Sequence, residues 1–220
     1  MPKYKKKLKV IDLFSGLGGF SQAFLDRDHK VTRYDFNPVF ENIPNTIIKD
    51  VLELTSDDLK DTDIILASID CTYFTYANHN PDKDGLEYSK KLARHTLNII
   101  QEARPTYYII ENPPSRLKEV LGPPQYKTAW GYWGMPYLKP TWLWGILPRI
   151  QWKTRYKEPQ PKKSWNLKTF KTHKFAYLCP RDSKLRSLVP YDFSKAVCIA
   201  VEKASHTQEV LIKCQSTRRR

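Results

Sequence analysis

Five short apolar runs in the first 112 residues, each ending in polar residues, most constrain what this chain can fold into. LKVIDLF is followed at once by the small-residue turn SGLGG and by the helical-looking FSQAFLD. KVTRYDF, TIIKD, DIILASI and YYIIEN come next, and a helical pattern runs from Glu87 to Ala103 until Pro105 ends it. Buried strands that alternate with helices are typical of a parallel sheet covered on both faces. We therefore expect an α/β fold with a doubly wound, mostly parallel sheet.

The second half of the chain has a different organisation. Residues 126–150 are aromatic and interrupted by prolines, which fits two strands joined by the turn GMPYLKP as an antiparallel hairpin. Residues 151–185 are rich in lysine and show no periodicity, whereas apolar residues recur at helical spacing over 193–204. We predict a core over 1–150, a small basic insert over 151–185, and a returning helix with a basic tail over 186–220.

Charge narrows the choice of partner. The 220 residues include 37 Lys and Arg against 23 Asp and Glu, which gives a formal net charge of +14. Such a positive field favours a polyanionic partner, with nucleic acid as the first candidate, over an acidic small molecule. Terminal lysine and arginine runs alone are usually only solvated tails.

Cysteine usage indicates the compartment. The four cysteines are scattered, and no signal peptide or long apolar segment opens the chain. A reduced, cytoplasmic protein without a membrane partner is expected, in the host cytoplasm if the chain is viral. His173, Cys179 and Asp182 lack the paired spacing of zinc ligands, so no metal is expected.

The turn after the first apolar run has features of a ligand-binding loop. Gly16, Gly18 and Gly19 remove side chains where a ligand would approach the backbone closely. Asp35, at the end of the second strand, is placed to accept hydrogen bonds from two ribose hydroxyls, and Asp50 to accept from an adenine amino group. The alternative for each acid is a helix cap or a solvated turn.

Two further strand ends carry reactive side chains. Cys71 follows DIILASI and one acid, and it is either a small core residue or a nucleophile presented at the edge of the sheet. Glu111 and Asn112 end the next apolar run, which two prolines stop. Because ligands bind beyond the carboxyl ends of parallel strands, we expect these side chains to meet at one edge.

Together these segments resemble the DNA cytosine-5 methyltransferases, in particular compact, phage-like members. The resemblance rests on DLFSGLGG, the acids of YDF and KDV, the cysteine of DCTYFTYA, ENP, and GYWGMPYLKPTWLW. It implies the Rossmann-like fold of class I S-adenosylmethionine-dependent methyltransferases, S-adenosylmethionine as cofactor, and duplex DNA as partner. The terminal basic runs and residues 151–185 lie outside it.

The resemblance also implies roles for individual residues. Cys71 would add to carbon 6 of a cytosine flipped out of the duplex, Glu111 would engage ring nitrogen 3, and Asn112 would fix the turn that orients Glu111. The implied cofactor-binding residues are Asp12, Leu13, Phe14, Ser15, Gly16, Gly18, Gly19, Asp35 and Asp50. The residues expected to contact the substrate are Lys127, Arg149, Lys162 and Lys163.

Two departures from the family pattern leave alternatives open. Ile69 and Asp70 stand where the family has two prolines, and a carboxylate beside a thiol opposes thiolate formation. Either Asp70 points away and pairs with a lysine or arginine, or the enzyme is slow, or the chain keeps the fold without the reaction. The short insert predicts a relaxed sequence preference or a partner that supplies specificity. A homodimer is a further expectation. RNA is an alternative substrate, and restriction-modification is one setting that such an activity serves.

Overall fold

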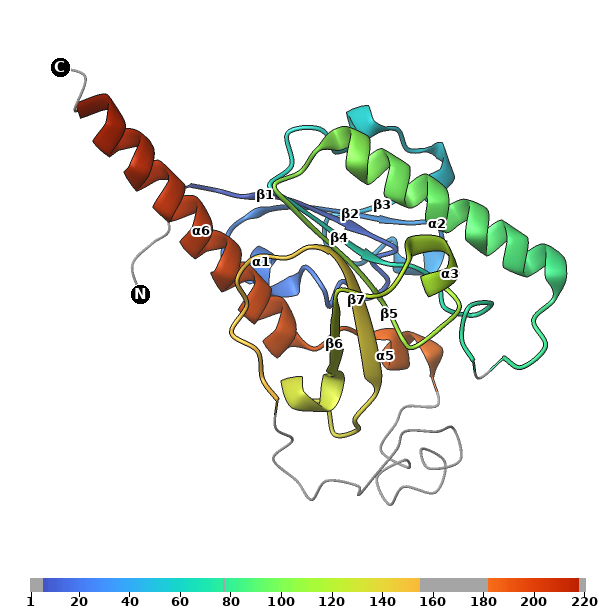
Figure 1. Ribbon diagram of the computed structural model, residues 1–220. Coiled ribbons are helices and arrows are strands. Elements are labelled where there is room, and N and C mark those ends of the chain that lie inside the picture. The colour runs from blue at the N-terminus through green and yellow to red at the C-terminus, as the bar shows by residue number, and fades with distance from the viewer. Residues whose placement is uncertain (1–5, 77, 155–181, 218–220) are drawn as a thin grey trace.

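The computed structural model describes residues 6–76, 78–154 and 182–217 (Figure 1). Most of the predicted insert, including Lys162 and Lys163, lies outside the described residues. Within them, seven strands form one sheet in the order β3-β2-β1-β4-β5-β7-β6. The strands are β1 (Lys9–Leu13), β2 (Lys30–Asp35), β3 (Thr46–Ile48), β4 (Ile64–Ser68), β5 (Tyr107–Asn112), β6 (Tyr126–Ala129) and β7 (Pro140–Ile146).

The strand directions confirm the predicted fold class. β1 to β5 are parallel, and β7 and β6 add to β5 as an antiparallel hairpin. β7 lies next to β5, with Asn112 opposite Trp142 and Tyr108 opposite Ile146. Because β1, β4 and β5 are neighbours and parallel, their carboxyl ends share one side of the sheet. We call this side the carboxyl edge.

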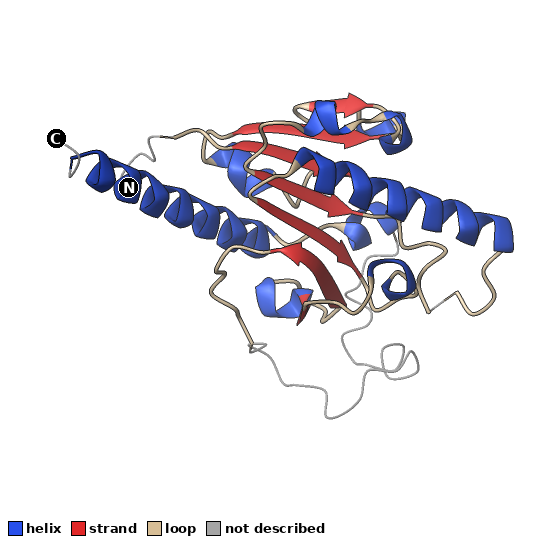
Figure 2. Cartoon of the chain, turned by 45° about the horizontal axis from the view of Figure 1, so that its top comes forward, coloured by secondary structure: helices blue, strands red, loops and turns tan. Residues whose placement is uncertain are grey.

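Helices cover both faces of the sheet (Figure 2). One face carries α1 (Gln22–Asp26) and α6 (Tyr191–Thr217), and the other carries α2 (Lys83–Ala103) and α3 (Lys118–Leu121). The connections contain α5 (Ser183–Ser187) and the 3-10 turns η1 (Pro38–Phe40), η2 (Val51–Glu53), η3 (Ser56–Leu59) and η4 (Trp130–Trp133). None of the described helices is long and apolar enough to cross a bilayer.

The two flanking helices differ in how well their bounds follow from the sequence. α2 begins where the Asp82 side chain accepts a hydrogen bond from Gly85 N at 2.8 Å, and it ends at Arg104, whose φ is 51°. The helical pattern predicted from Glu87 is therefore confirmed and starts one turn earlier. α1 is shorter than the predicted helical segment, because the turn that follows Gly18 extends through Ser21.

The start of the insert is fixed to the core and to the start of α6. Lys153 Nζ lies 2.6 Å from Asp192 Oδ2 at the start of α6. The Trp152 ring stacks on Tyr126 with centroids 5.1 Å apart, and its centroid lies 6.4 Å from that of Phe193. Phe193 itself is fully buried in the layer between the sheet and α6. The described start of the insert is thus held against the start of α6.

Candidate active site

A buried polar network supports the turn between β1 and α1. Asp12, which is fully buried, accepts a hydrogen bond from Ser21 Oγ at 2.6 Å, and Arg33 Nε donates to the same hydroxyl at 2.9 Å. An Arg33 guanidinium nitrogen also donates to Gly18 O at 3.0 Å. Burial raises the pKa of Asp12 to about 7, although the Ser21 hydrogen bond and the Arg33 charge oppose the shift. Within the described part of the chain, Asp12 Oδ1 has no partner.

The glycines of this turn have different surroundings. A Cβ at Gly18 would lie 2.5 Å from the guanidinium carbon of Arg33, and one at Gly19 would lie 2.7 Å from the carbonyl oxygen of Val189. The close approach predicted for a ligand at Gly18 and Gly19 is therefore made by the protein itself, which corrects the predicted reason for these two glycines. A Cβ at Gly16 would meet only Phe40, at 3.9 Å. The open side of the turn is thus at Gly16.

The residues before Gly16 differ in what they offer a ligand. Leu13 is fully buried in the core, so its backbone alone is available. Phe14 is partly buried and has a left-handed φ of 57°. Ser15 is 9% exposed, and its hydroxyl has no partner among the described residues. A buried hydroxyl without a partner is uncommon in folded proteins, so Ser15 is a candidate contact for a ligand.

The two predicted acids both bind backbone amides. Asp35 Oδ2 accepts from Gly16 N at 2.9 Å and Oδ1 from Asn37 N at 3.0 Å, which leaves about two of its lone pairs for other donors. Asp50 caps η2 by accepting from Leu52 N at 2.9 Å, so the cap considered as the alternative is present. Phe36, directly after Asp35, is 66% exposed and was missed, although its place beside the acid was a usable signal.

Glu111 is a buried carboxyl group at the carboxyl edge. Ser68 and Glu111 are opposite each other in the parallel pair of β4 and β5. Glu111 is 5% exposed, and its Oε2 has no partner within the described ranges. Burial raises the pKa of Glu111, while the charge of Lys139 and a hydrogen bond from Ser68 act in the opposite direction.

Cys71 lies beyond the end of β4, where its side chain is partly buried. Its carbonyl accepts hydrogen bonds from Phe74 N at 3.1 Å and Thr75 N at 2.8 Å, which form the turn that presents the side chain. Burial raises the pKa of the thiol, and the charges of Asp70 and Glu111 raise it further, whereas Lys139 lowers it. Cys71 and Glu111 are thus close enough to interact electrostatically, as the predicted meeting of the strand ends requires.

Asp70 and Asn112 hold the segment around Cys71. Asp70 is exposed, and its Oδ1 accepts from Thr72 N at 3.0 Å and Thr72 Oγ1 at 2.7 Å, so Thr72 takes the place expected for a lysine or arginine. Asn112 is 1% exposed, donates from Nδ2 to Ile69 O at 2.7 Å, and accepts from Ser115 Oγ at 2.9 Å. Asn112 therefore ties the segment that precedes Cys71 to the end of β5.

Lys139 is a site residue that the sequence interpretation missed. It lies immediately before β7, and its charge acts on both Cys71 and Glu111. Its Nζ donates to Arg186 O at 2.8 Å. The signal for it was the LKP of the hairpin turn, which contributed to the family resemblance without being assigned a role.

Two predicted substrate-binding residues take different places. Lys127 is exposed on β6, opposite Trp142 of β7, and its Nζ lies 5.7 Å from the centroid of that ring. Since Trp142 is opposite Asn112, Lys127 is at the carboxyl edge. Arg149 follows β7 at the other side of the sheet, because Ile146 is opposite Tyr108 near the start of β5. The structure therefore does not bring Arg149 together with Cys71 and Glu111, and its contact with a substrate stays a prediction.

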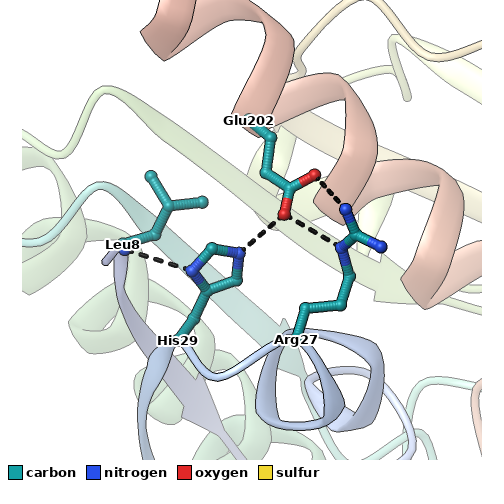
Figure 3. A network of polar contacts seen from close by, with 4 residues as sticks. All are labelled: Leu8, Arg27, His29 and Glu202. Atoms are coloured by element: carbon teal, nitrogen blue, oxygen red, sulfur yellow. Dashed lines mark hydrogen bonds and ion pairs between the residues drawn. The ribbon is translucent and has the colours of Figure 1, made fainter. Parts of the chain in front are cut away.

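A second buried cluster joins α6 to the turn before β2 (Figure 3). Glu202 accepts from Arg27 at 2.9 and 2.6 Å, and its Oε1 lies 3.0 Å from His29 Nε2. Leu8 N donates to His29 Nδ1 at 3.2 Å, so the proton of the neutral ring is on Nε2 and is donated to Glu202. Burial lowers the pKa of His29, which favours this neutral form. We call these side chains the α6 clasp.

The clasp has the spacing of a metal site but the wrong chemistry. Ligand atoms of His29, Cys198 and Glu202 lie within 4.8 Å of one another. However, Glu202 is already bound by Arg27, His29 presents an N–H, and burial raises the pKa of Cys198 to about 12. A divalent cation requires deprotonated ligands and is repelled by the guanidinium group. The clasp is a structural ion-pair network, and the expectation that the protein has no metal stays a prediction.

Comparison with known proteins identifies the family. The profile of the C-5 cytosine-specific DNA methylases matches residues 8–121, more than half of the chain. The structure is similar to an E. coli protein described as a DNA modification methyltransferase encoded within a prophage, with 19% identity, a TM-score of 0.48, and 64% and 47% of the two chains covered. It is also similar to the Dnmt2 methyltransferase of S. pombe, with 21% identity, a TM-score of 0.47, and 71% and 57% covered. The chain spans about half the length of these two structures. A search among curated proteins finds no match.

Proposed function

The chain belongs to the C-5 cytosine-specific DNA methylase family, and from this premise we propose that it transfers a methyl group from S-adenosylmethionine to carbon 5 of cytosine in DNA. The observation that carries the proposal is the pairing of a partly exposed Cys71 with a buried Glu111 whose Oε2 has no partner among the described residues. Such a pair suits a thiol nucleophile and a carboxyl group that hydrogen-bonds the ring under attack.

The proposed chemistry assigns a role to each side chain. Cys71 adds to carbon 6 of the cytosine, and the new C–S bond makes carbon 5 nucleophilic enough to accept the methyl group. Glu111, whose pKa is raised by burial, hydrogen-bonds ring nitrogen 3 and stabilises the charge that develops as sulfur adds. Loss of the proton from carbon 5 and release of the Cys71 thiolate restore the aromatic ring. Asn112 keeps the Cys71 segment beside β5 through Ile69.

The open side of the glycine turn fits S-adenosylmethionine, which supplies the methyl group when bound. Gly16 faces open space, and the buried Ser15 hydroxyl has no partner in the described part of the chain. Asp35 keeps lone pairs for ribose hydroxyls, and the exposed ring of Phe36 offers a face for adenine. Asp50 has a second carboxylate oxygen besides the one that caps η2. We therefore assign residues 12–16, Asp35, Phe36 and Asp50 to the cofactor site, while Gly18 and Gly19 shape the turn that presents it.

The burial of Glu111 determines how the target cytosine can reach it. A side chain that is 5% exposed cannot reach a cytosine stacked in a duplex, so the base is flipped out. Flipping costs a few kcal/mol, which backbone contacts from a chain of net charge +14 can offset. Lys127, with the Trp142 ring beside it, is placed for such contacts at the carboxyl edge. In this proposal residues 1–150 are the catalytic core, 151–185 the reduced target-recognition segment, and 186–220 the returning helix.

The proposal is tested with the purified protein and labelled S-adenosylmethionine. Duplex DNA should become labelled more efficiently than RNA of the same sequence, and DNA that contains 5-fluorocytosine should trap a covalent adduct, because fluorine cannot leave carbon 5 as a proton does. Cys71→Ala should abolish label and adduct, whereas Cys198→Ala, in the core, should retain both. Transfer that survives Cys71→Ala would contradict the mechanism. Preferential labelling of RNA would change the substrate, and salt-sensitive binding without transfer would identify a silent member of the family.

A further inference from the structure

We propose that Lys139 is a positioning residue that acts through Cys71: the segment after the insert holds its ammonium group at the carboxyl edge, where it stabilises the Cys71 thiolate. The inference deepens the proposed function and rests on the proposed role of Cys71 as the nucleophile. It concerns the question that the departure at Asp70 raised, namely how a thiol beside an acid becomes reactive.

The hairpin places Lys139 beyond the end of β5. Leu143 is opposite Glu111 and Trp142 is opposite Asn112, so each residue toward the start of β7 lies further past the carboxyl edge. Lys139 immediately precedes Pro140, the first residue of that strand. Its backbone is fixed because its carbonyl accepts from Trp130 N at 3.0 Å. Its side chain is fixed because Nζ donates to Arg186 O at 2.8 Å.

The backbone at Lys139 is strained. Its φ is 35°, in the left-handed region, which glycine adopts without strain and which a residue with a Cβ atom adopts at a steric cost. The following residue, Pro140, further restricts the conformations open to position 139. Strain of this kind persists where the surrounding structure imposes it, and it is found frequently at functional sites. A lysine in a position suited to glycine indicates that the side chain has a task.

That task follows from the charges around the thiol. Burial opposes the charged form of Cys71, and the carboxylates of Asp70 and Glu111 oppose it as well. The charge of Lys139 acts in the other direction on both Cys71 and Glu111. The pKa of Cys71 is raised even with this cation in place, and without it the pKa would rise further and the thiolate would become scarcer at neutral pH.

The anchor of Lys139 connects the site to the insert. Arg186 belongs to α5, the first described element after residues 155–181. A few residues later, Leu188 and Val189 occupy the space beside Gly19 in the glycine turn. One short stretch, residues 182–189, therefore contacts both Lys139 and the proposed cofactor turn. Its position sets the reactivity of Cys71.

The test measures thiol reactivity and requires neither cofactor nor nucleic acid. The rate at which iodoacetamide alkylates Cys71 is followed by peptide mass spectrometry between pH 6.5 and 10. Lys139→Met should slow alkylation roughly tenfold at neutral pH and move the profile to higher pH, as loss of one nearby opposite charge does. Lys139→Arg should stay close to the wild type. Asp70→Asn, which keeps the oxygen that accepts from Thr72, should act in the opposite direction and speed alkylation.

A glycine variant separates charge from structure. Lys139→Gly relieves the positive φ, so it should melt no lower than Lys139→Met and still alkylate slowly. Wild-type alkylation in both folded variants would overturn the proposal, and so would equal slowing in Lys139→Arg. If the wild-type protein transfers no methyl group while Lys139→Met still slows alkylation, the proposed function fails and the inference about Lys139 stands.

Discussion

Glu111 and Glu202 are both buried glutamates, yet their surroundings differ in every respect that matters for chemistry. Both oxygens of Glu202 are bound, by Arg27 and His29, and the result is the α6 clasp (Figure 3). Glu111 has one oxygen without a partner in the described residues, a hydrogen bond from Ser68, and the charge of Lys139 acting on it, and it lies close enough to the Cys71 thiol to affect its pKa.

The difference teaches how to separate a structural carboxylate from a functional one. A buried charge with all its partners rigidifies the fold, whereas a buried polar atom without a partner costs stability unless a ligand satisfies it. Glu202 lies between helix and sheet, and Glu111 lies at the end of a central strand where ligands of α/β proteins bind. Burial alone would have ranked the two residues as equivalent.

The strongest test of the distinction between a structural and a functional carboxylate is to replace each glutamate in turn by glutamine. Glu202→Gln should lower the free energy of unfolding by about 3 kcal/mol, because Arg27 and His29 lose a buried partner. Glu111→Gln should change it by less than about 1 kcal/mol, since it removes an uncompensated buried charge, and should reduce methyl transfer about 100-fold or more. Urea unfolding at pH 7 and the labelled-DNA assay measure the two effects. Equal losses of stability would invalidate the distinction.

Asp12 offers an intermediate case, with one oxygen bound to Ser21 and the other without a partner in the described residues. Its pKa is raised from 3.8 to about 7, so the unfolded chain releases this proton first as the pH rises. The stabilising contribution of the protonated group is therefore complete below about pH 4 and is lost as the pH approaches 7, by an amount of the order of a few kcal/mol.

Asp12→Asn should flatten that dependence, because the amide does not titrate. Urea unfolding of the wild type and the variant at pH 5 and pH 8 measures the change, with Asp70→Asn, at an exposed position, as the control. An unchanged slope in Asp12→Asn would show that the turn does not bury an ionisable group in the way described.

The smallest effect is expected at Asn112, which links the two strand ends. Asn112→Ala removes the bond to Ile69 O and leaves a buried carbonyl unpaired, at a cost of about 1–3 kcal/mol. It should also lower methyl transfer, because the Cys71 segment loses its tie to β5. Ser115→Ala removes only the partner of Asn112 Oδ1 and should cost less in both measurements. Thermal melting and initial rates under the same conditions provide the comparison, and a larger loss for Ser115→Ala would contradict it.

The sheet was predictable from the sequence because each strand is a local pattern. DIILASI and YYIIEN are continuous apolar runs, and β4 and β5 lie within them. The length of α1 was not predictable, since it depends on how far the glycine turn extends. The place of β7 beside β5 was not specified either, because a hairpin pattern does not state which of its strands joins the sheet.

The site divides in the same way. Cys71 and Glu111 could be placed at one edge because strand ends are visible in the sequence and parallel strands share their direction. The sequence named Arg149 and passed over Lys139, because the distance of each from Cys71 depends on the register of β7. The surroundings of Gly18 and Gly19 depend on Arg33 and Val189, and the α6 clasp joins Arg27 to Glu202 across most of the chain. Contacts of this range leave no local signal.

The anchoring of the insert by Lys153 to Asp192 and by Trp152 on Phe193 has a consequence for engineering. The described residues on either side of 155–181 are held by the core, so lengthening that segment twofold should add only about 0.6 kcal/mol of closure entropy. Nucleic-acid recognition domains of other proteins can therefore be inserted between residues 154 and 182. A change of the recognised sequence would leave Cys71 reactive as long as residues 182–189 keep these contacts with Lys139 and Gly19.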